Sequence, residues 1–210
     1  MLLLALFIEK GFLYFIFFSF VGWSWESFQY TIENKKFINR GFLKGPYCPI
    51  YGWGGLIIIA FLHNIDNVFA LFFCGSLLCT ALEYMTSLIL EKIFNKRWWD
   101  YSSYRFNLHG RICLICSTTF GVLSVLLVKL VQPFMDRMIV YFPENGIHCI
   151  FMITFTAYIV DNLYTFYHMS NSIRTAFPFD KFKKLSAVPQ LSNSAKLKIS
   201  EKFVGGNNNE

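Results

Sequence analysis

The chain has 210 residues, of which 55% are hydrophobic, 20% are aromatic and only 15% are charged, and its formal net charge is +6. Soluble domains carry about 25% charged residues, so this composition excludes an ordinary soluble protein. The basic residues lie beside apolar stretches, where they orient a membrane protein and contact anionic lipid. The positive charge therefore does not indicate nucleic acid as a partner.

The apolar stretches predict an all-α membrane protein, built as a bundle of about five transmembrane helices. A crossing helix needs about 20 apolar residues, and five stretches approach this length, at about residues 11–32, 47–62, 68–93, 112–131 and 147–167. We expect them to form one polytopic membrane domain over residues 1–169. The polar, basic residues 170–210 would then be a cytoplasmic tail, largely disordered because its apolar content is low.

The first predicted span ends in a polar segment that contains two tryptophans. Trp23 and Trp25 suit a membrane–water interface, where an indole ring meets both lipid and water. Glu26 follows, within about one to two helical turns of the end of the span. A carboxylate at that depth is costly to insert, so it indicates a polar partner or water nearby.

The second predicted span is short for a membrane crossing, and it begins irregularly. Pro46, Pro49, Gly52, Gly54 and Gly55 cluster at its start and weaken regular helix there. Irregular backbone survives in a membrane only where it is buried in protein or lines a wet cavity. The pattern predicts either a broken or re-entrant start to this span, or an ordinary loop with proline in the first helical turn.

The third predicted span is apolar in its first half and carries acids in its second. Glu83 and Ser87 are four residues apart and therefore share a helix face. Glu91 is eight residues beyond Glu83, which is about 80° round the helix and two turns on. Because a charge at the bilayer centre costs about 2.5–3.5 kcal/mol, we expect these acids to face one another, a cation or water.

The distribution of lysine and arginine predicts the orientation of the spans. Residues 33–47, residues 94–111 and the tail are rich in both. Residues 63–67 have neither, and the polar connection at 132–146 has only Arg137. Because basic loops stay in the cytoplasm, we expect the N-terminus outside and the C-terminus in the cytoplasm. The protein would be a multi-pass protein of the plasma (inner) membrane.

This orientation places nearly every unusual polar residue in the cytoplasmic half of the bundle and leaves the outer half almost bare. We therefore predict a cytoplasm-facing polar pocket in which acids meet arginines, since arginine can grip a carboxylate or phosphate at two points. The candidate substrate-binding residues are Glu26, Asn39, Arg40, Tyr51, Glu83, Glu91, Asp100, Asn107, Arg111 and Asp161. A catalytic residue is not identified, but Glu83, Glu91 and Glu26 are the candidates.

Three kinds of function fit such a pocket. A permease-like component would bind a small or amphipathic solute there. An integral membrane enzyme would act on a lipid headgroup, with one carboxylate as general acid or base and an arginine on the anionic group. A structural subunit of a membrane complex would use the acid–arginine pairs to hold helices together.

The sequence gives no firm signal for a cofactor, and none is predicted. His109 is the only histidine among the clustered polar residues, which argues against zinc. The acids are of the kind that hold a divalent metal with a phosphate substrate, which stays an alternative. Cys113-x-x-Cys116 has redox or zinc spacing, but no second cysteine or histidine pair completes it.

The motifs that carry these residues resemble a known bacterial family. The resemblance runs from about residue 10 to 168 and rests on Gly22-Trp23-Ser24-Trp25-Glu26, Asn39-Arg40-Gly41-Phe42-Leu43-Lys44-Gly45-Pro46-Tyr47-Cys48-Pro49-Ile50-Tyr51-Gly52, Glu83-Tyr84, Glu91-Lys92-Ile93-Phe94, Trp98-Trp99-Asp100-Tyr101-Ser102 and Asn107-Leu108-His109-Gly110-Arg111-Ile112-Cys113-Leu114. These stretches are similar to the family described as "Putative ABC-transporter type IV". More distantly, the chain resembles a group of eukaryotic multi-pass membrane proteins.

This resemblance implies a permease. Because the chain carries no nucleotide-binding motif, an ATPase would be a separate subunit. A chain of 210 residues with five spans is small for a complete transport path, so a homo-oligomer or another partner is expected. Membrane lipids are the remaining expected partner.

Overall fold

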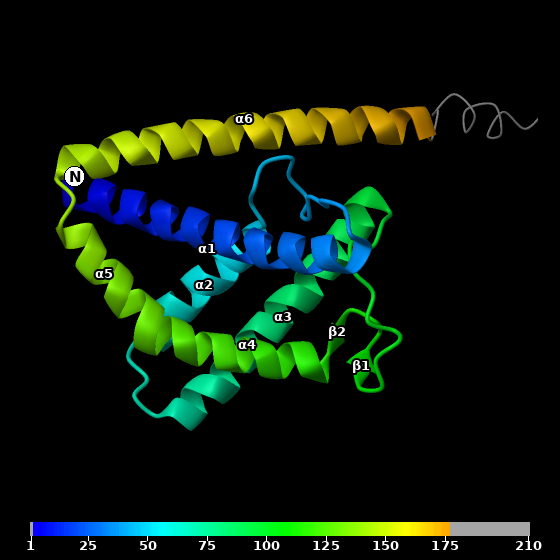
Figure 1. Ribbon diagram of the computed structural model, residues 1–210, viewed down its shortest axis with the longest axis horizontal. Helices are drawn as coiled ribbons and strands as arrows, with labels where there is room; N and C mark the ends of the chain where they lie inside the picture. The colour runs from blue at the N-terminus through cyan, green and yellow to red at the C-terminus, as the bar shows by residue number, and fades with distance from the viewer. Residues whose placement is uncertain (1, 177–210) are drawn as a thin grey trace, which may run out of the picture. The chain divides into compact units, whose positions relative to one another are not determined.

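The computed structural model describes residues 2–176 and contains six α-helices over that range (Figure 1). They are α1 (Leu2–Asn34), α2 (Pro49–Leu62), α3 (Val68–Phe94), α4 (Leu114–Leu126), α5 (Gln132–Val140) and α6 (Glu144–Ala176), with a π-helical turn, η1 (Leu127–Val131), between α4 and α5. Two short strands, β1 (Asn107–Leu108) and β2 (Ile112–Cys113), pair antiparallel before α4. The helical class is confirmed. Of the predicted tail, residues 177–210 lie outside the described part.

Four helical segments are long and apolar enough to cross a membrane: Leu4–Asn34, Val68–Phe94, Leu114–Val140 and Glu144–Met169. They correspond to the first, third, fourth and fifth predicted spans, as expected of a multi-pass membrane protein. The second predicted span corresponds to α2, which has 14 residues and is therefore about 21 Å long at 1.5 Å per residue. This is shorter than a hydrocarbon core of about 30 Å.

The ends of α3 follow from local sequence signals. Before it, the side chain of Asn67 accepts hydrogen bonds from the backbone N–H groups of Phe69 and Ala70 and so caps the first turn. After it, Asn95 adopts the left-handed conformation with φ 51°, and its N–H donates to the Glu91 carbonyl at 2.8 Å. Asparagine tolerates this conformation, which ends many helices.

The fourth span is longer than predicted because the helix continues past Pro133. The predicted connection at 132–146 is wrong for residues 132–140, which form α5. Proline has no N–H and would leave a helical carbonyl unpaired. Here the helix widens for one turn, in which the Gln132 N–H donates to the carbonyl of Leu127, five residues earlier. Only residues 141–143 remain as a connection to α6.

Helices α1 and α2 run antiparallel and touch at glycines. A Cβ built on Gly22 would lie 2.2 Å from the ring of Tyr51, and one on Gly55 would lie 2.4 Å from the ring of Phe18. Helix α3 approaches α4 in the same way, since a Cβ on Gly75 would lie 2.2 Å from a serine of α4. In lipid, where burial of apolar groups does not drive helix association, such close packing at small residues holds helices together.

The loops at residues 35–48 and 95–113 lie at the same end of the bundle, which we call the loop end. Helices α1, α2, α3 and α4 alternate in direction, so each of these loops joins helices there (Figure 1). The ring of Phe42 in the first loop contacts Phe94 and also Trp98 in the second. A buried apolar cluster, Ile58, Leu62, Leu71 and Val128, lies toward the opposite end.

The chain enters α2 through a non-helical segment that runs beside α1, and α2 itself is a continuous helix with Pro49 in its first turn. Along it, the N–H of Arg40 donates to Ser27 Oγ at 3.2 Å, and the N–H of Cys48 donates to the Ser19 carbonyl at 3.0 Å. Ser19 precedes the last residue of α1, Asn34, by fifteen residues, or about 22 Å of helix. Helix α2 therefore begins part-way along α1.

We expect Gly52→Ala to destabilise the protein, because its Cβ would lie 2.3 Å from Ser19 Oγ and 2.6 Å from the Phe15 ring. Overpacking of this kind costs about 1–3 kcal/mol. Thermal unfolding of the purified protein in detergent would measure it. Gly11→Ala in α1 is the matched control, since its Cβ would meet nothing within 4 Å. Equal melting temperatures for the two variants would contradict the packing described for α1 and α2.

Candidate functional site

Glu26 of α1 contacts a tyrosine at the start of α2 and an arginine of the first loop. The hydroxyl of Tyr51 donates to Glu26 Oε1 at 2.8 Å, and Arg40 Nε lies 3.8 Å from Glu26 Oε2. The Arg40 guanidinium also lies 3.8 Å from the centre of the Tyr30 ring, a cation–π contact. Three of the predicted site residues, from α1, the first loop and α2, are therefore together.

Glu83 of α3 is buried inside the bundle, where it is 6% exposed. Only one of its two carboxylate oxygens accepts a hydrogen bond from a described residue. The Tyr101 hydroxyl, from the second loop, donates to Glu83 Oε1 at 3.0 Å, whereas Glu83 Oε2 has no hydrogen-bond partner among the described residues. Burial, followed by the charge of Glu83, raises the pKa of Tyr101 well above its usual range, so the phenol stays protonated and remains a donor.

The two carboxylates belong to one acidic cluster, defined as Glu26, Tyr51, Glu83 and Tyr101. Glu26 and Glu83 act electrostatically on each other, and both act on Tyr51, which is half-buried. Glu26 has an arginine as its counter-charge, but no cation reaches Glu83 within the described chain. The unsatisfied oxygen therefore belongs to the member of the cluster that lacks a counter-charge.

Glu91, near the C-terminal end of α3, forms a second polar group with Arg111 of the second loop. Arg111 Nη1 donates to Ser87 Oγ at 3.0 Å, and Arg111 Nη2 pairs with Glu91 Oε2. Glu91 Oε1 also pairs with Arg97 Nε at 3.1 Å. Arg111 is buried at 9% exposure. Its bonds to Ser87 and Glu91 attach the second loop to α3.

Asp100 and Asn107 shape the second loop instead of lining the acidic cluster. Asp100 Oδ1 accepts from the N–H of Ser102 at 2.9 Å and from its hydroxyl, and these bonds hold the pKa of Asp100 below its usual range. Asn107 Oδ1 accepts from the Gly110 N–H at 2.9 Å. Such turn-forming bonds are typical of both residue types, and they position Tyr101 in this loop for its bond to Glu83.

Asn39 and Asp161 hold the first loop against α1 and α6. Asn39 Oδ1 accepts from Trp23 Nε1 at 2.5 Å, and its amide donates to the Lys44 carbonyl at 2.7 Å. Asp161 Oδ2 accepts from the backbone N–H of Gly45 at 2.9 Å. Asn39 therefore links the first loop to α1 and to its own backbone, whereas Asp161 links the backbone of that loop to α6.

A polar group at the opposite end of the bundle corrects the prediction that this half is almost bare. Glu9 of α1 is buried and contacts His148 Nδ1 of α6 at 2.7 Å, and the Tyr14 hydroxyl bonds to Asp136 of α5. Sequence reasoning missed them because it began the first span at residue 11 and read residues 132–146 as a connection. Glu9, an acid within an apolar stretch, is the sequence feature that could have indicated a polar group at this end.

Within the part of the chain that the structure describes, no three His, Cys, Asp or Glu side chains are grouped as metal ligands. The Sγ atoms of Cys113 and Cys116 lie 2.9 Å apart, and Cys113 Sγ accepts from the Cys116 N–H at 3.3 Å. This pair caps the first turn of α4.

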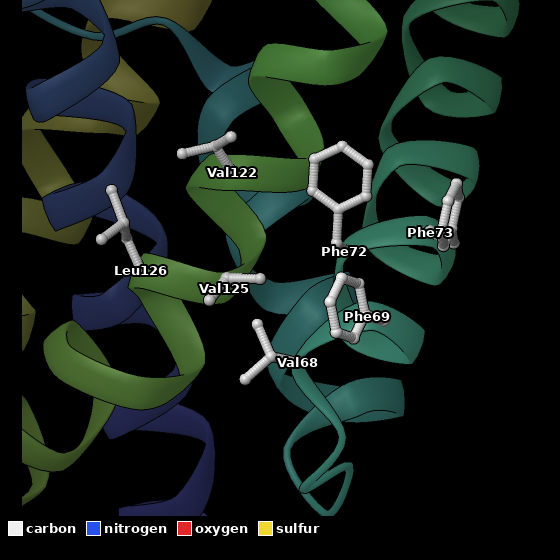
Figure 2. Close-up of a pocket in the computed structure, with 7 residues that line it drawn as sticks. All are labelled: Val68, Phe69, Phe72, Phe73, Val122, Val125 and Leu126. Atoms are coloured by element: carbon white, nitrogen blue, oxygen red, sulfur yellow. The ribbon is translucent and has the colours of Figure 1, made fainter.

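An apolar groove of about 450 Å³ lies between α3 and α4, toward the end of α3 that is far from the acidic cluster (Figure 2). Figure 2 shows the Phe72 ring between the two helices, where it packs on Gly121. The groove is lined by Val68, Phe69, Phe72, Phe73, Val122, Val125 and Leu126. Without a polar lining side chain it offers no recognition of a polar solute, and its surface suits lipid chains.

Replacing Arg111 with lysine should destabilise the protein more than the same change at Arg97. Lysine lacks the planar fork with which Arg111 bonds to Ser87 and Glu91 together, and loss of the buried bond to Ser87 would cost about 1.5–3 kcal/mol. Arg97 pairs with the same carboxylate, but its side chain is 38% exposed, and solvent weakens an exposed pair. Thermal unfolding of Arg111→Lys and Arg97→Lys checks this. Similar losses in both would show that burial of Arg111 is not what gives its pair weight.

Comparison with known families gives independent evidence on what kind of protein this is. The sequence model of the family described as "Putative ABC-transporter type IV" matches residues 13–166. This range contains both loops and all ten predicted substrate-binding residues. No curated protein and no solved structure matches the chain. The resemblance seen in the motifs is thereby confirmed, and the chain belongs to this family of transporter-like, multi-pass membrane proteins.

Proposed function

We propose that the protein is a permease-like membrane component that binds a small or amphipathic solute at the acidic cluster, through a cationic or hydrogen-bond-donating group of the solute. The observation that carries this proposal is Glu83 Oε2, a buried carboxylate oxygen without a partner in the described chain. An unsatisfied buried acceptor is costly, so such atoms call for a reason. A donor supplied by a solute would complete the site.

The side chains around Glu83 support binding of a polar group of the solute. The hydroxyls of Tyr51 and Tyr101 are already oriented by Glu26 and Glu83, so they need no rearrangement when a solute arrives. Fixed groups of this kind strengthen binding because little ordering remains to be done. Their rings also offer apolar contact to the body of an amphipathic solute.

The helix directions and the basic loops together support a cytoplasmic position for the loop end. Rings of α1 and α6 meet at Phe12 with Phe151 and Phe155, and the Glu9–His148 contact gives these helices the same direction. The first and second loops carry the lysines and arginines that stay in the cytoplasm. We infer an N-terminus outside and a cytoplasmic end at α6, with α2 as the short crossing.

The family assignment supports a transport role, and the chain has no nucleotide-binding motif. A separate ATPase subunit is therefore part of the proposal. Helix α6 exposes large apolar side chains over much of its length, among them Ile153, Val160 and Leu163. This surface suits lipid, a second copy of the chain or such a partner.

A thermal-shift screen of small amines, diamines and polyols in detergent would test solute binding. A ligand at a hundred times its Kd stabilises by about 2.7 kcal/mol, so hits should raise the melting temperature of the wild type. We expect Glu83→Gln to lose these shifts, because it removes the charge of the unsatisfied carboxylate. Glu33→Gln, an exposed acid on α1, is the matched control and should keep them. Equal shifts in both variants would refute binding at Glu83.

The orientation has its own test. Ser103→Cys, in the second loop, should stay unlabelled by a membrane-impermeant maleimide in intact cells and become labelled after the membrane is opened. Asn64→Cys, in the exposed turn between α2 and α3, should be labelled in intact cells. Both signals are read above the background of the native cysteines. The reverse pattern would show that the loop end faces outward.

A further inference from the structure

A second site lies on the outer side of α3, apart from the acidic cluster. It is an open depression of about 440 Å³ lined by Leu88, Ile89, Glu91, Lys92 and Arg111. We propose that this depression binds the headgroup of an anionic phospholipid, with its phosphate between Lys92 and Arg111. Glu83 faces the interior whereas Ile89 is 51% exposed, so the inference does not depend on the solute site.

The charges of the depression favour an anion. Glu91 is its only acid, and that carboxylate is already shared by Arg97 and Arg111. Lys92 makes no ion pair with any described residue. The depression is therefore lined by two cations and one carboxylate, and Arg97, which lies outside the lining, shares that carboxylate. The excess positive charge is on the exposed Lys92, with the buried Arg111 also in the lining.

The guanidinium of Arg111 is held in place before any ligand arrives. Ser87 and Glu91 fix two of its nitrogens, and its backbone carbonyl accepts from Trp99 Nε1 at 3.0 Å. An arginine ordered in this way loses little freedom on binding. Lys92, with its flexible stem, can then close on the phosphate from the exposed side.

The position of the depression selects a lipid over a free phosphate. Leu88 and Ile89 are 37% and 51% exposed on a helix that is long and apolar enough to cross a membrane, so they would touch acyl chains. Trp98 and Trp99 follow α3 closely and mark the level of the headgroups. Anionic lipids are concentrated in the cytoplasmic leaflet, which faces the loop end in the orientation proposed above.

Binding of a fluorescent short-chain phosphatidylglycerol to the full chain in neutral detergent would test this inference, with the matching phosphatidylcholine as the reference lipid. We expect phosphatidylglycerol to bind more tightly, and Lys92→Gln to weaken its binding about fivefold. Lys96→Gln is the matched control: Lys96 is also exposed, near the same end of α3, and contacts the Trp98 ring. It should leave the affinity unchanged.

Three results would contradict binding of an anionic lipid at this depression. Equal binding of the two lipids would overturn the proposal, because the depression would then not distinguish an anionic headgroup from a zwitterionic one. Equal weakening by Lys92→Gln and Lys96→Gln would also overturn it, because general surface charge would then be responsible. Competition with glycerol phosphate separates the two sources of phosphate. If glycerol phosphate displaced the probe at concentrations similar to unlabelled phosphatidylglycerol, the site would be a phosphate site and not a lipid site. Because Lys92 is exposed, an unchanged melting temperature for Lys92→Gln would exclude misfolding.

Discussion

The structure depends on one constraint of the bilayer, which is that backbone N–H and C=O groups must be satisfied by protein. The chain reaches α2 without helical hydrogen bonds of its own, so other elements supply the partners. Ser27 receives the Arg40 N–H, the carbonyl of Ser19 receives the Cys48 N–H, and Asp161 receives the Gly45 N–H. A non-helical segment inside a helical bundle is tolerated because each of these groups is paired.

The position of α2 along α1 decides where the acidic cluster forms. Since α2 begins part-way along α1, Tyr51 reaches Glu26 instead of the loops, and both come within electrostatic range of Glu83. The second loop contributes Tyr101 from the other direction. The two acids then differ in their surroundings: Glu26 has an arginine beside it, whereas one oxygen of Glu83 has no partner among the described residues.

Helix α3 carries two groups of opposite character on different faces. Glu83 faces the interior, where it meets tyrosines, whereas Glu91 stands near the helix end between two arginines. The offset of about 80° between residues eight apart separates these surroundings. One helix can therefore support a solute site inside the bundle and a lipid contact at its rim without the two sharing a side chain.

The sequence by itself determined the membrane class, the four long spans and the gathering of the two basic loops at one end, because hydropathy and charge act locally and additively along the chain. Its motifs determined the family. It also identified the face shared by Glu83 and Ser87, since helical spacing fixes it. The tertiary structure decided which polar residues serve the fold. Asn39, Asp100 and Asn107 bond to backbone groups within a few residues of themselves and so shape the two loops. Asp161 instead accepts from the Gly45 N–H, which only the folded chain brings to it. Glu9 joined His148 only because α1 begins earlier than its apolar core suggests. A carboxylate in a sequence does not reveal its partner, and the partner decides whether that carboxylate holds the structure or remains open to a ligand.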